Sequence, residues 1–188
     1  MRNDSHKWTA PPDQRQPVTQ NGLTIRPVPL QRQTLLSGPI QTCLQLAQQP
    51  SATGWPAPAS GTSYALRLRR DRILSINGPA LPDGWHPDGV AISDMTDGYA
   101  CIEITGQGAL DLLNQGTELD PGTPSNSCAR LFQGQPCLIY HWQTDSLRLH
   151  IEHPHTEALW KHLISCLLYT SDAARRRLRC RSRWSPYH

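Results

Sequence analysis

The sequence lacks the features that would place it in several large classes of protein. It has no run of about 18 apolar residues, so we expect no membrane-spanning helix and no membrane partner. Its first residues, MRNDSHKWTAPP, contain no apolar segment of the kind that a secretory signal requires. Its cysteines form no CxxC pair. We therefore expect Cys43, Cys101, Cys128 and Cys137 to be free thiols of a cytoplasmic protein.

No complete catalytic or cofactor-binding motif is present either. The GQG sequence at Gly106 follows a predicted strand and opens a predicted helix, but Asp111 occupies the third glycine position of GxGxxG. We interpret this sequence as a tight turn rather than a phosphate site. There is no GxSxG motif. Asp94, Asp97, Glu103 and Asp111 are isolated candidates for a general base, so we assign no catalytic residue and leave the cofactor-binding residues unknown.

Three histidines gather near the end of the last predicted strand. His150, His153 and His155 have side chains that suit Zn²⁺. However, strand alternation and the break at Pro154 turn them in different directions, and no Cys, Asp or Glu completes a metal-binding spacing. We favour solvated residues at a strand-to-helix junction and predict no metal site.

One basic cluster lies in the body of the chain. It comprises Arg67, Arg69, Arg70 and Arg72, and the first two share the strand face opposite the neighbouring leucines. A solvated face is the favoured interpretation, and contact with an anion or a partner is the alternative. No aromatic residues interleave with these arginines, so a platform for single-stranded nucleic acid is poorly supported.

The C-terminal residues 166–188 differ in character from the rest. They begin CLLYTSDAA, which looks like translated transposase adapter sequence, and continue with an arginine-rich run. We interpret them as a non-native tail; an arginine-rich tail that binds nucleic acid is the alternative. This tail contains six arginines and one acid, so the other 165 residues carry 12 basic and 14 acidic side chains. The formal charge of +3 then becomes −2, and we expect no nucleic-acid partner.

Residue periodicity predicts an α+β fold with antiparallel sheets and helices packed on them. The predicted strands span 34–37, 64–69, 72–77, 90–93, 98–105, 128–132, 136–142 and 146–151. The predicted helices are one that Ser37 caps and that ends before Pro50, one over 106–115 and one over 155–165. A β-α-β-β order occurs in residues 34–77 and again in 98–142, and the short turns disfavour a parallel doubly wound sheet.

The domain organisation follows from composition. Residues 1–22 are polar and rich in Pro and Gln, so we expect a disordered arm. Residues 23–165 are long enough for a single domain with a hydrophobic core.

Several segments together resemble the gamma subunit of heterotetrameric sarcosine oxidase. They are ISDMTD at 92–97, IEITGQGALDLL at 102–113, GTELD at 116–120, SCAR at 127–130, SLRLHI at 146–151 and ALWKHL at 158–163. The segment 66–76, LRLRRDRILSI, is similar to a divergent form of a hairpin in that family. The resemblance covers about residues 34–165. The pattern is also similar to the aminomethyltransferase T-protein of the glycine cleavage system, which implies that fold in two β-α-β-β halves.

The resemblance implies a function for the chain. It implies a non-catalytic accessory subunit of a flavoenzyme complex whose large subunits oxidatively demethylate sarcosine. The implied partners are alpha and beta subunits and a small zinc-binding delta subunit. FAD, FMN, NAD and tetrahydrofolate are then expected on those partners, with no cofactor on this chain. The alternative is a free-standing folate-binding aminomethyltransferase-like protein, which would require a deep pocket lined by aromatics and an acid such as Asp94.

Overall fold

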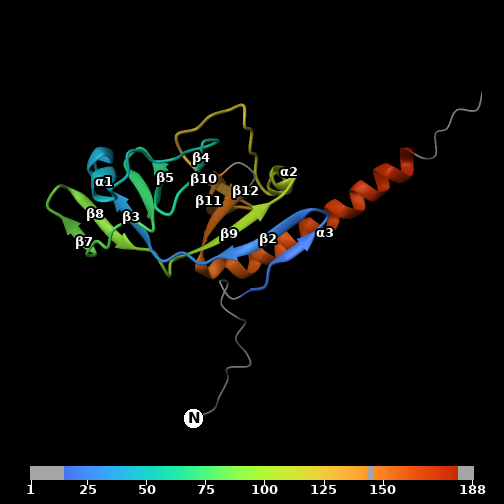
Figure 1. Cartoon of the computed structure of the whole chain (residues 1–188), viewed down its shortest axis with the longest axis horizontal. Coiled ribbons are helices and arrows are strands. Elements are labelled where there is room, and N and C mark those ends of the chain that lie inside the picture. Colours follow the sequence, from blue (N-terminus) through green and yellow to red (C-terminus); the bar gives the residue numbers. More distant parts are fainter. Residues whose placement is uncertain (1–14, 144–145, 182–188) are drawn as a thin grey trace, which may run out of the picture.

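The computed structural model of the chain describes residues 15–143 and 146–181, with side chains in 15–143 and 146–168. It has an α+β fold in which two antiparallel sheets are accompanied by few helices (Figure 1). This agrees with the fold class that residue periodicity predicts. In the described part of the chain, no helix is long and apolar enough to cross a membrane.

Two sheets, A and B, contain the strands. In spatial order, sheet A consists of β1 (Val18–Gln20), β2 (Leu23–Val28), β9 (Tyr99–Thr105), β12 (Ser146–Glu152), β11 (Gln135–Trp142) and β10 (Ala129–Phe132), and β4 (Pro58–Ala59) pairs in parallel with β11. Sheet B consists of β5 (Tyr64–Arg69), β6 (Arg72–Ile76), β3 (Gln33–Ser37), β8 (Val90–Asp94) and β7 (Gly84–His86). The helices are α1 (Ile40–Leu46), α2 (Ala109–Leu113), the 3₁₀ helix η3 (His153–His155) and α3 (Thr156–Arg181).

The two sheets pack face to face, and the helices cover their outer faces. Sheet A, on the right in Figure 1, buries Ile104 and Leu149 against Leu112 of α2 and Leu163 of α3. Sheet B, on the left, packs its outer face against α1. Side chains from both sheets form a third cluster between them. The interior therefore has three apolar clusters, and the middle one joins the sheets.

Strand β12 shows how alternate side chains of one strand point to the two faces of sheet A. Leu147, Leu149 and Ile151 alternate toward the helices and are buried. Arg148 and His150 alternate toward sheet B and are buried as well. Because a second sheet covers this face, the polar residues of the strand cannot reach solvent and need partners inside the protein.

The N-terminal boundary of the packed domain differs from the prediction. Residues 18–20, expected in the disordered arm, form β1 and pair with β2. Asn21 and Gly22 connect the two strands with φ angles of 53° and 77°, which are the positive values that a tight two-residue hairpin turn requires. Residues 1–14 of the expected arm lie outside the described residues.

The C-terminal boundary also differs. The closing helix was expected to end near Ser165, but α3 continues to Arg181. Cys166 and Leu167 are buried in the cluster beneath sheet A, because they extend the apolar stripe that Leu159 and Leu163 begin. The packed domain therefore continues past the expected end at residue 165. Residues 182–188 of the expected non-native tail lie outside the described residues.

Two further details correct the sequence-based picture. The N-cap residue of α1 is Pro39 and has no side-chain cap. Ser37 lies in β3, where its hydroxyl group accepts a hydrogen bond from Arg72 Nε at 3.0 Å.

The two β-α-β-β segments also differ from each other in how their strands pair. In the first, β6 lies between β5 and β3, whereas in the second β12 separates β9 from β11. The repeat is thus one of element order and not of strand pairing.

Candidate functional site

The space between the sheets holds a network of polar side chains, which begins with a ladder of three charges on sheet A. Glu103 of β9 stands opposite Arg26 of β2 and opposite Arg148 of β12 in the strand registers. Arg148 Nε donates to Oε2 of Glu103 at 2.8 Å, and Arg26 donates to Oε1 through Nε at 3.0 Å and NH2 at 2.6 Å. Glu103 and Arg148 are 4% and 6% exposed, so each needs the other to offset the cost of burying a charge.

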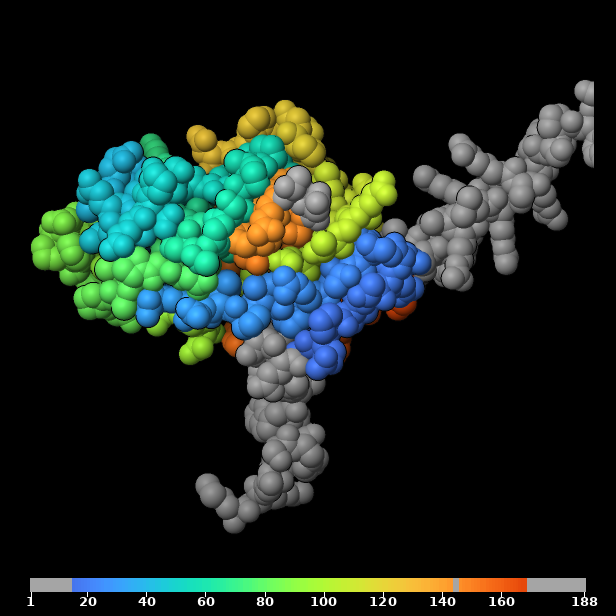
Figure 2. All heavy atoms as spheres, in the orientation of Figure 1, coloured from blue at the N-terminus to red at the C-terminus, as the bar shows by residue number. Residues whose placement is uncertain are grey.

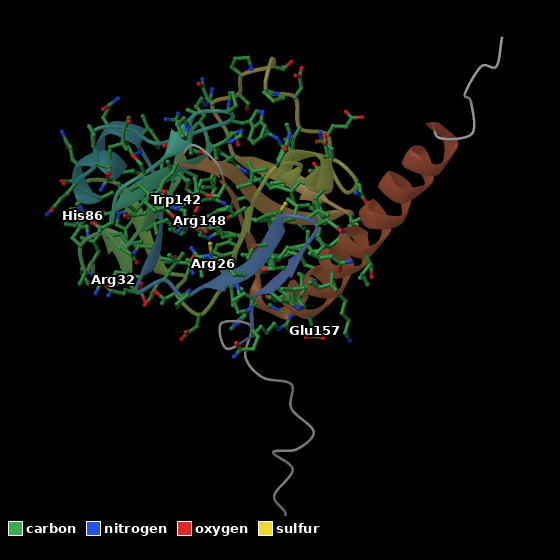
Figure 3. The ribbon with its side chains drawn as sticks, turned by 45° about the vertical axis from the view of Figure 1, so that its right-hand side comes forward. Arg26, Arg32, His86, Trp142, Arg148 and Glu157 are labelled. Carbon is green, nitrogen blue, oxygen red and sulfur yellow. The ribbon has the colours of Figure 1, made fainter. Side chains whose placement is uncertain are left out.

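Arg148 connects this ladder to aromatic residues. Its guanidinium carbon lies 3.5 Å from the centre of the Trp142 ring, within the range of a cation–π contact. Its NH1 group donates to the hydroxyl oxygen of Tyr64, on sheet B, at 3.1 Å. Figure 3 shows Arg148 and Trp142 together in the interior of the protein, with Arg26 nearby. The arginine therefore bridges the two sheets.

A chain of hydrogen bonds continues from this point. The hydroxyl groups of Tyr64 and Tyr140 lie 2.7 Å apart, and Tyr140 lies 2.9 Å from Nε2 of His150. The other ring nitrogen of His150, Nδ1, is 2.8 Å from Oε1 of Gln33 in sheet B. Each of these four side chains is buried. The chain crosses between the sheets twice, once at each end.

The direction of each hydrogen bond follows from its neighbours. Gln33 Nε2 donates to the carbonyl oxygens of Tyr99 at 2.7 Å and Thr96 at 3.3 Å, so its Oε1 is the acceptor toward His150. Nδ1 of His150 must therefore carry the proton, and Nε2 accepts from the hydroxyl group of Tyr140. Tyr140 in turn accepts from Tyr64. Every bond then has one donor and one acceptor.

The protonation states support this arrangement. Burial, assisted by the charge of Arg148, lowers the pKa of His150 to about 3. Burial raises the pKa of Tyr64 and holds that of Tyr140 well above its usual value. Burial also raises the pKa of the neighbouring Cys101 thiol to about 12. At neutral pH these groups are uncharged. The network therefore joins the two sheets through side chains that carry no charge at neutral pH.

A cavity of about 310 Å³ adjoins the network. Gln33, Tyr99 and Cys101 line it on the network side, and Thr156 and Trp160 line it on the side of α3. The Thr156 hydroxyl group is buried, and no hydrogen-bond partner for it occurs in the described part of the chain. The cavity is at the small end of the range for ligand pockets.

A second hollow lies beside the loop between α2 and β10, and its lining includes Pro58, Pro121 and His141. In Figure 2 this loop, in gold, lies over the teal segment that carries β4. Trp55 holds the two together, since it bridges to Ser125 and its indole NH donates to the carbonyl oxygen of Asp120 at 2.9 Å. The Trp55 ring also stacks on His141 at 4.8 Å. The indole thus fixes the loop above sheet A.

The structure separates the four acids that were candidates for a general base. Glu103 is inside the charge ladder, whereas Asp94, Asp97 and Asp111 are exposed. Hydrogen bonds from the hydroxyl and backbone NH of Thr96 lower the pKa of Asp94. A carboxylate stabilised in this way is a weak base, and Asp94 is absent from the lining of both cavities described above.

The histidine cluster is also divided. His150 is inside the network, while His153 is exposed and His155 half-buried in η3. Among the residues that the structure describes, no three potential metal ligands come together.

Gly106 and Gly108 both have positive φ angles at the start of α2, and a side chain at Gly106 would overlap the carbonyl oxygen of Gly22. The glycine pair thus serves a tight turn against the β1–β2 hairpin.

The sequence analysis missed most of the network. Gln33, Tyr64 and Tyr140 were not singled out as polar residues that need partners inside the protein. The alternation of charged and apolar residues in Cys101–Thr105 and Leu147–Leu149 does not by itself distinguish a face covered by a second sheet from a solvated face. The pairing of Glu103 with Arg148 required the register of strands that lie far apart in the sequence.

Comparisons with known proteins agree with this architecture. No protein-family model matches the chain, and no curated protein matches it. Among solved structures, it is similar to a chain of the heterotetrameric sarcosine oxidase from Corynebacterium sp. U-96, determined in complex with pyrrole 2-carboxylate. The TM-score is 0.63 at 15% sequence identity, and the match covers 81% of this chain and 87% of that chain. The two chains share a fold, so the expected structural relationship to a sarcosine oxidase complex is confirmed at this level.

Proposed function

We propose that this chain is a non-catalytic accessory subunit of a sarcosine oxidase-type flavoenzyme complex. The observation that carries the proposal is the shared fold, which extends over most of both chains. Because the match covers similar fractions of each, the two chains are of similar length. The sequence resemblance to the gamma subunit, over about residues 34–165, is independent of that structural match.

The interior of the protein supports a binding role. The polar groups between the sheets are paired with one another. A general base must reach its substrate within hydrogen-bond distance, and His150 and Glu103 are both committed to other side chains. In the proposed complex, larger alpha and beta subunits and a small delta subunit would be the partners. The flavins, NAD and tetrahydrofolate would lie on those partners.

Co-purification tests the proposal. The chain is co-expressed with the large sarcosine oxidase-type subunits from the same genome, and the mixture is separated by size-exclusion chromatography. We expect co-elution, because a stable complex of this kind buries at least about 1,000 Å². Sarcosine-dependent peroxide production, or the thermal stability of the complex, should fall when the chain is omitted. A Leu112→Asp variant, which places a charge in the core beneath sheet A, serves as the folding-deficient control.

One result would replace this proposal. If the chain remains monomeric in the mixture and binds tetrahydrofolate alone, the free-standing aminomethyltransferase-like function is the better account. Binding is measured by calorimetry on the purified chain. A Gln33→Ala variant, which alters the wall of the 310 Å³ cavity, then shows whether that cavity is the site.

A further inference from the structure

A cleft opens where the β5–β6 hairpin of sheet B meets sheet A. The hairpin is attached to the start of β10 by three hydrogen bonds. Cys128 N and Cys128 Sγ donate to the Arg67 carbonyl at 2.8 Å and 3.2 Å, and Ser127 Oγ donates to the Leu68 carbonyl at 2.5 Å. Beside this attachment lies a cavity of about 300 Å³ with walls from both sheets. Its position is therefore fixed by the contact that joins the sheets and does not depend on a single loop.

Three arginines line this cleft. Arg69 and Arg72 come from the two strands of the hairpin, and Arg130 comes from β10 of the other sheet. Arg69 and Arg72 are direct partners in the strand register, and like charges in that position destabilise a hairpin. Within the described residues, none of the three has a carboxylate oxygen within 4.0 Å. The three arginines therefore concentrate positive charge in the cleft, and none of them forms a direct ion pair in the described part of the chain.

Two of these guanidinium groups are held in place, and all three keep free donors. Arg72 uses only Nε, which donates to Ser37 Oγ at 3.0 Å. Arg130 uses NH1, which donates to the carbonyl oxygens of Ser127 at 3.1 Å and Ala129 at 2.7 Å. The guanidinium group of Arg69 donates to no group in the described part of the chain. Since a guanidinium group carries five N–H donors, several remain available to an anion in the cleft.

The rest of the lining is mainly apolar. Leu68 and Leu138 are buried, Tyr99 is half-buried, and Pro136 completes this side. Glu152 also lines the cleft and is exposed. Its single negative charge offsets one of the three arginines, so the lining keeps a net charge of +2. An occupant matched to these walls has an anionic group at one end and an apolar body at the other.

We propose that this cleft binds a small organic anion, one that carries a carboxylate or phosphate group on an apolar body of about the size of one aromatic ring. Arginine recognises both groups through paired N–H donors. The proposal rests on the contacts of the cleft and is independent of the proposed subunit role, since it concerns the isolated chain. It also assigns a binding role to Arg69 and Arg72, two of the four arginines that the sequence analysis placed on a solvated face.

Calorimetric titration of the full chain tests the proposal with four probes. Benzoate and phenyl phosphate carry the two candidate anionic groups, benzyl alcohol carries the ring without a charge, and acetate carries the charge without a ring. We expect saturable binding of benzoate, phenyl phosphate or both, with benzyl alcohol and acetate at least about tenfold weaker. Whichever aromatic anion binds more tightly identifies the anionic group.

Matched variants locate the site. Arg69→Gln and Arg130→Gln should each weaken binding by about tenfold, because each removes a charged donor from the cleft. Arg70→Gln removes the same charge from the same hairpin, but Arg70 does not line the cleft. The affinity of this variant for the aromatic anion should therefore stay within about twofold of that of the original chain. Thermal unfolding of each variant shows that it is folded. The proposal is overturned if no aromatic anion binds at millimolar concentration, or if Arg70→Gln weakens binding as much as the other two.

Discussion

The phenolic oxygen of Tyr140 lies 2.9 Å from Nε2 of His150, and this contact fixes the protonation of the imidazole ring. Because Oε1 of Gln33 accepts from Nδ1, the ring proton lies on Nδ1, and the unprotonated Nε2 accepts from the hydroxyl group of Tyr140. A second proton on the ring would place two donors against each other inside the protein. The neutral histidine is thus a condition for the two sheets to stay packed, and its titration is a measurable property of the fold.

The free energy of unfolding should decrease as the pH falls below 6. The pKa of His150 is about 3 in the folded protein and about 6.5 when the chain is unfolded. Between these values the unfolded state binds one more proton, so stability rises with pH and is lost as the pH falls from about 6.5 toward 3. We expect a loss of about 1 kcal/mol per pH unit between pH 6 and pH 4 from this residue. Urea titrations at several pH values measure it.

A variant without an ionisable group separates this effect from those of the carboxylates. His150→Gln lacks the titration, so the difference between its pH profile and that of the original chain isolates His150. If the two profiles run parallel from pH 6 to pH 4, His150 titrates alike in the folded and unfolded states, and the network does not hold its imidazole neutral.

Neutralising Glu103 should destabilise the protein strongly. Glu103→Gln keeps the size of the side chain but leaves Arg148 buried without its counter-charge, which costs about 3 kcal/mol. Glu157→Gln is the matched control. Glu157 also contacts two cations, Arg15 and Lys161, but its side chain is 39% exposed, so its loss should cost less than about 1 kcal/mol. Chemical denaturation measures both, and equal losses would contradict the buried ladder.

Truncation should reveal where the packed part of α3 ends. A chain that ends at Leu168 keeps Cys166 and Leu167 in the core, whereas a chain that ends at Ser165 removes both. We expect the longer form to melt within about 2 °C of the full chain and the shorter form roughly 5–10 °C lower. Differential scanning calorimetry compares the three. An unchanged melting temperature for the shorter form would show that the core ends at residue 165.

Gly106→Ala should cost about 3 kcal/mol of stability. The new methyl group would overlap the carbonyl oxygen of Gly22, and the residue has a φ of 117°, so steric overlap adds to backbone strain. Gly134→Ala is the control, because Gly134 has a φ of 76° but nothing within 4 Å of the added atom; about 1 kcal/mol is expected there. Thermal unfolding distinguishes the two. A smaller loss at Gly106 than at Gly134 would mean that the β1–β2 turn does not pack on this glycine.

Local patterns predicted most strands of the fold correctly. The alternation of Tyr64–Arg69 and Ser146–Glu152 identified β5 and β12, because apolar residues at every second position mark one face of a strand. The spacing of apolar residues in the helix predicted over 106–115 places Leu112 and Leu113 on its inward face, and both are buried in α2. The exposed position of Arg69 is confirmed as well. Each of these features depends on residues that are close in the sequence.

The missed features had weaker or more distant signals. The hairpin at Asn21 and Gly22 was detectable from its turn residues and from the alternation of Leu23 and Ile25, but the polar composition around it favoured a disordered arm. The network of Glu103 and Arg148 depends on a register between strands separated by more than 40 residues. The facing of two sheets, which determines that these polar residues are buried, is likewise not contained in the pattern of any one strand.

The order of donors and acceptors between the sheets limits how the sequence can change during evolution. Replacing Tyr140 with phenylalanine alone would leave Nε2 of His150 without a donor and the Tyr64 hydroxyl without an acceptor. The residues of this hydrogen-bond chain are therefore expected to vary together in related proteins, with apolar replacements arising at several positions at once. Tyr64, Tyr140, His150 and Gln33 would form a single unit of covariation, although as many as 117 positions separate two of them in the sequence.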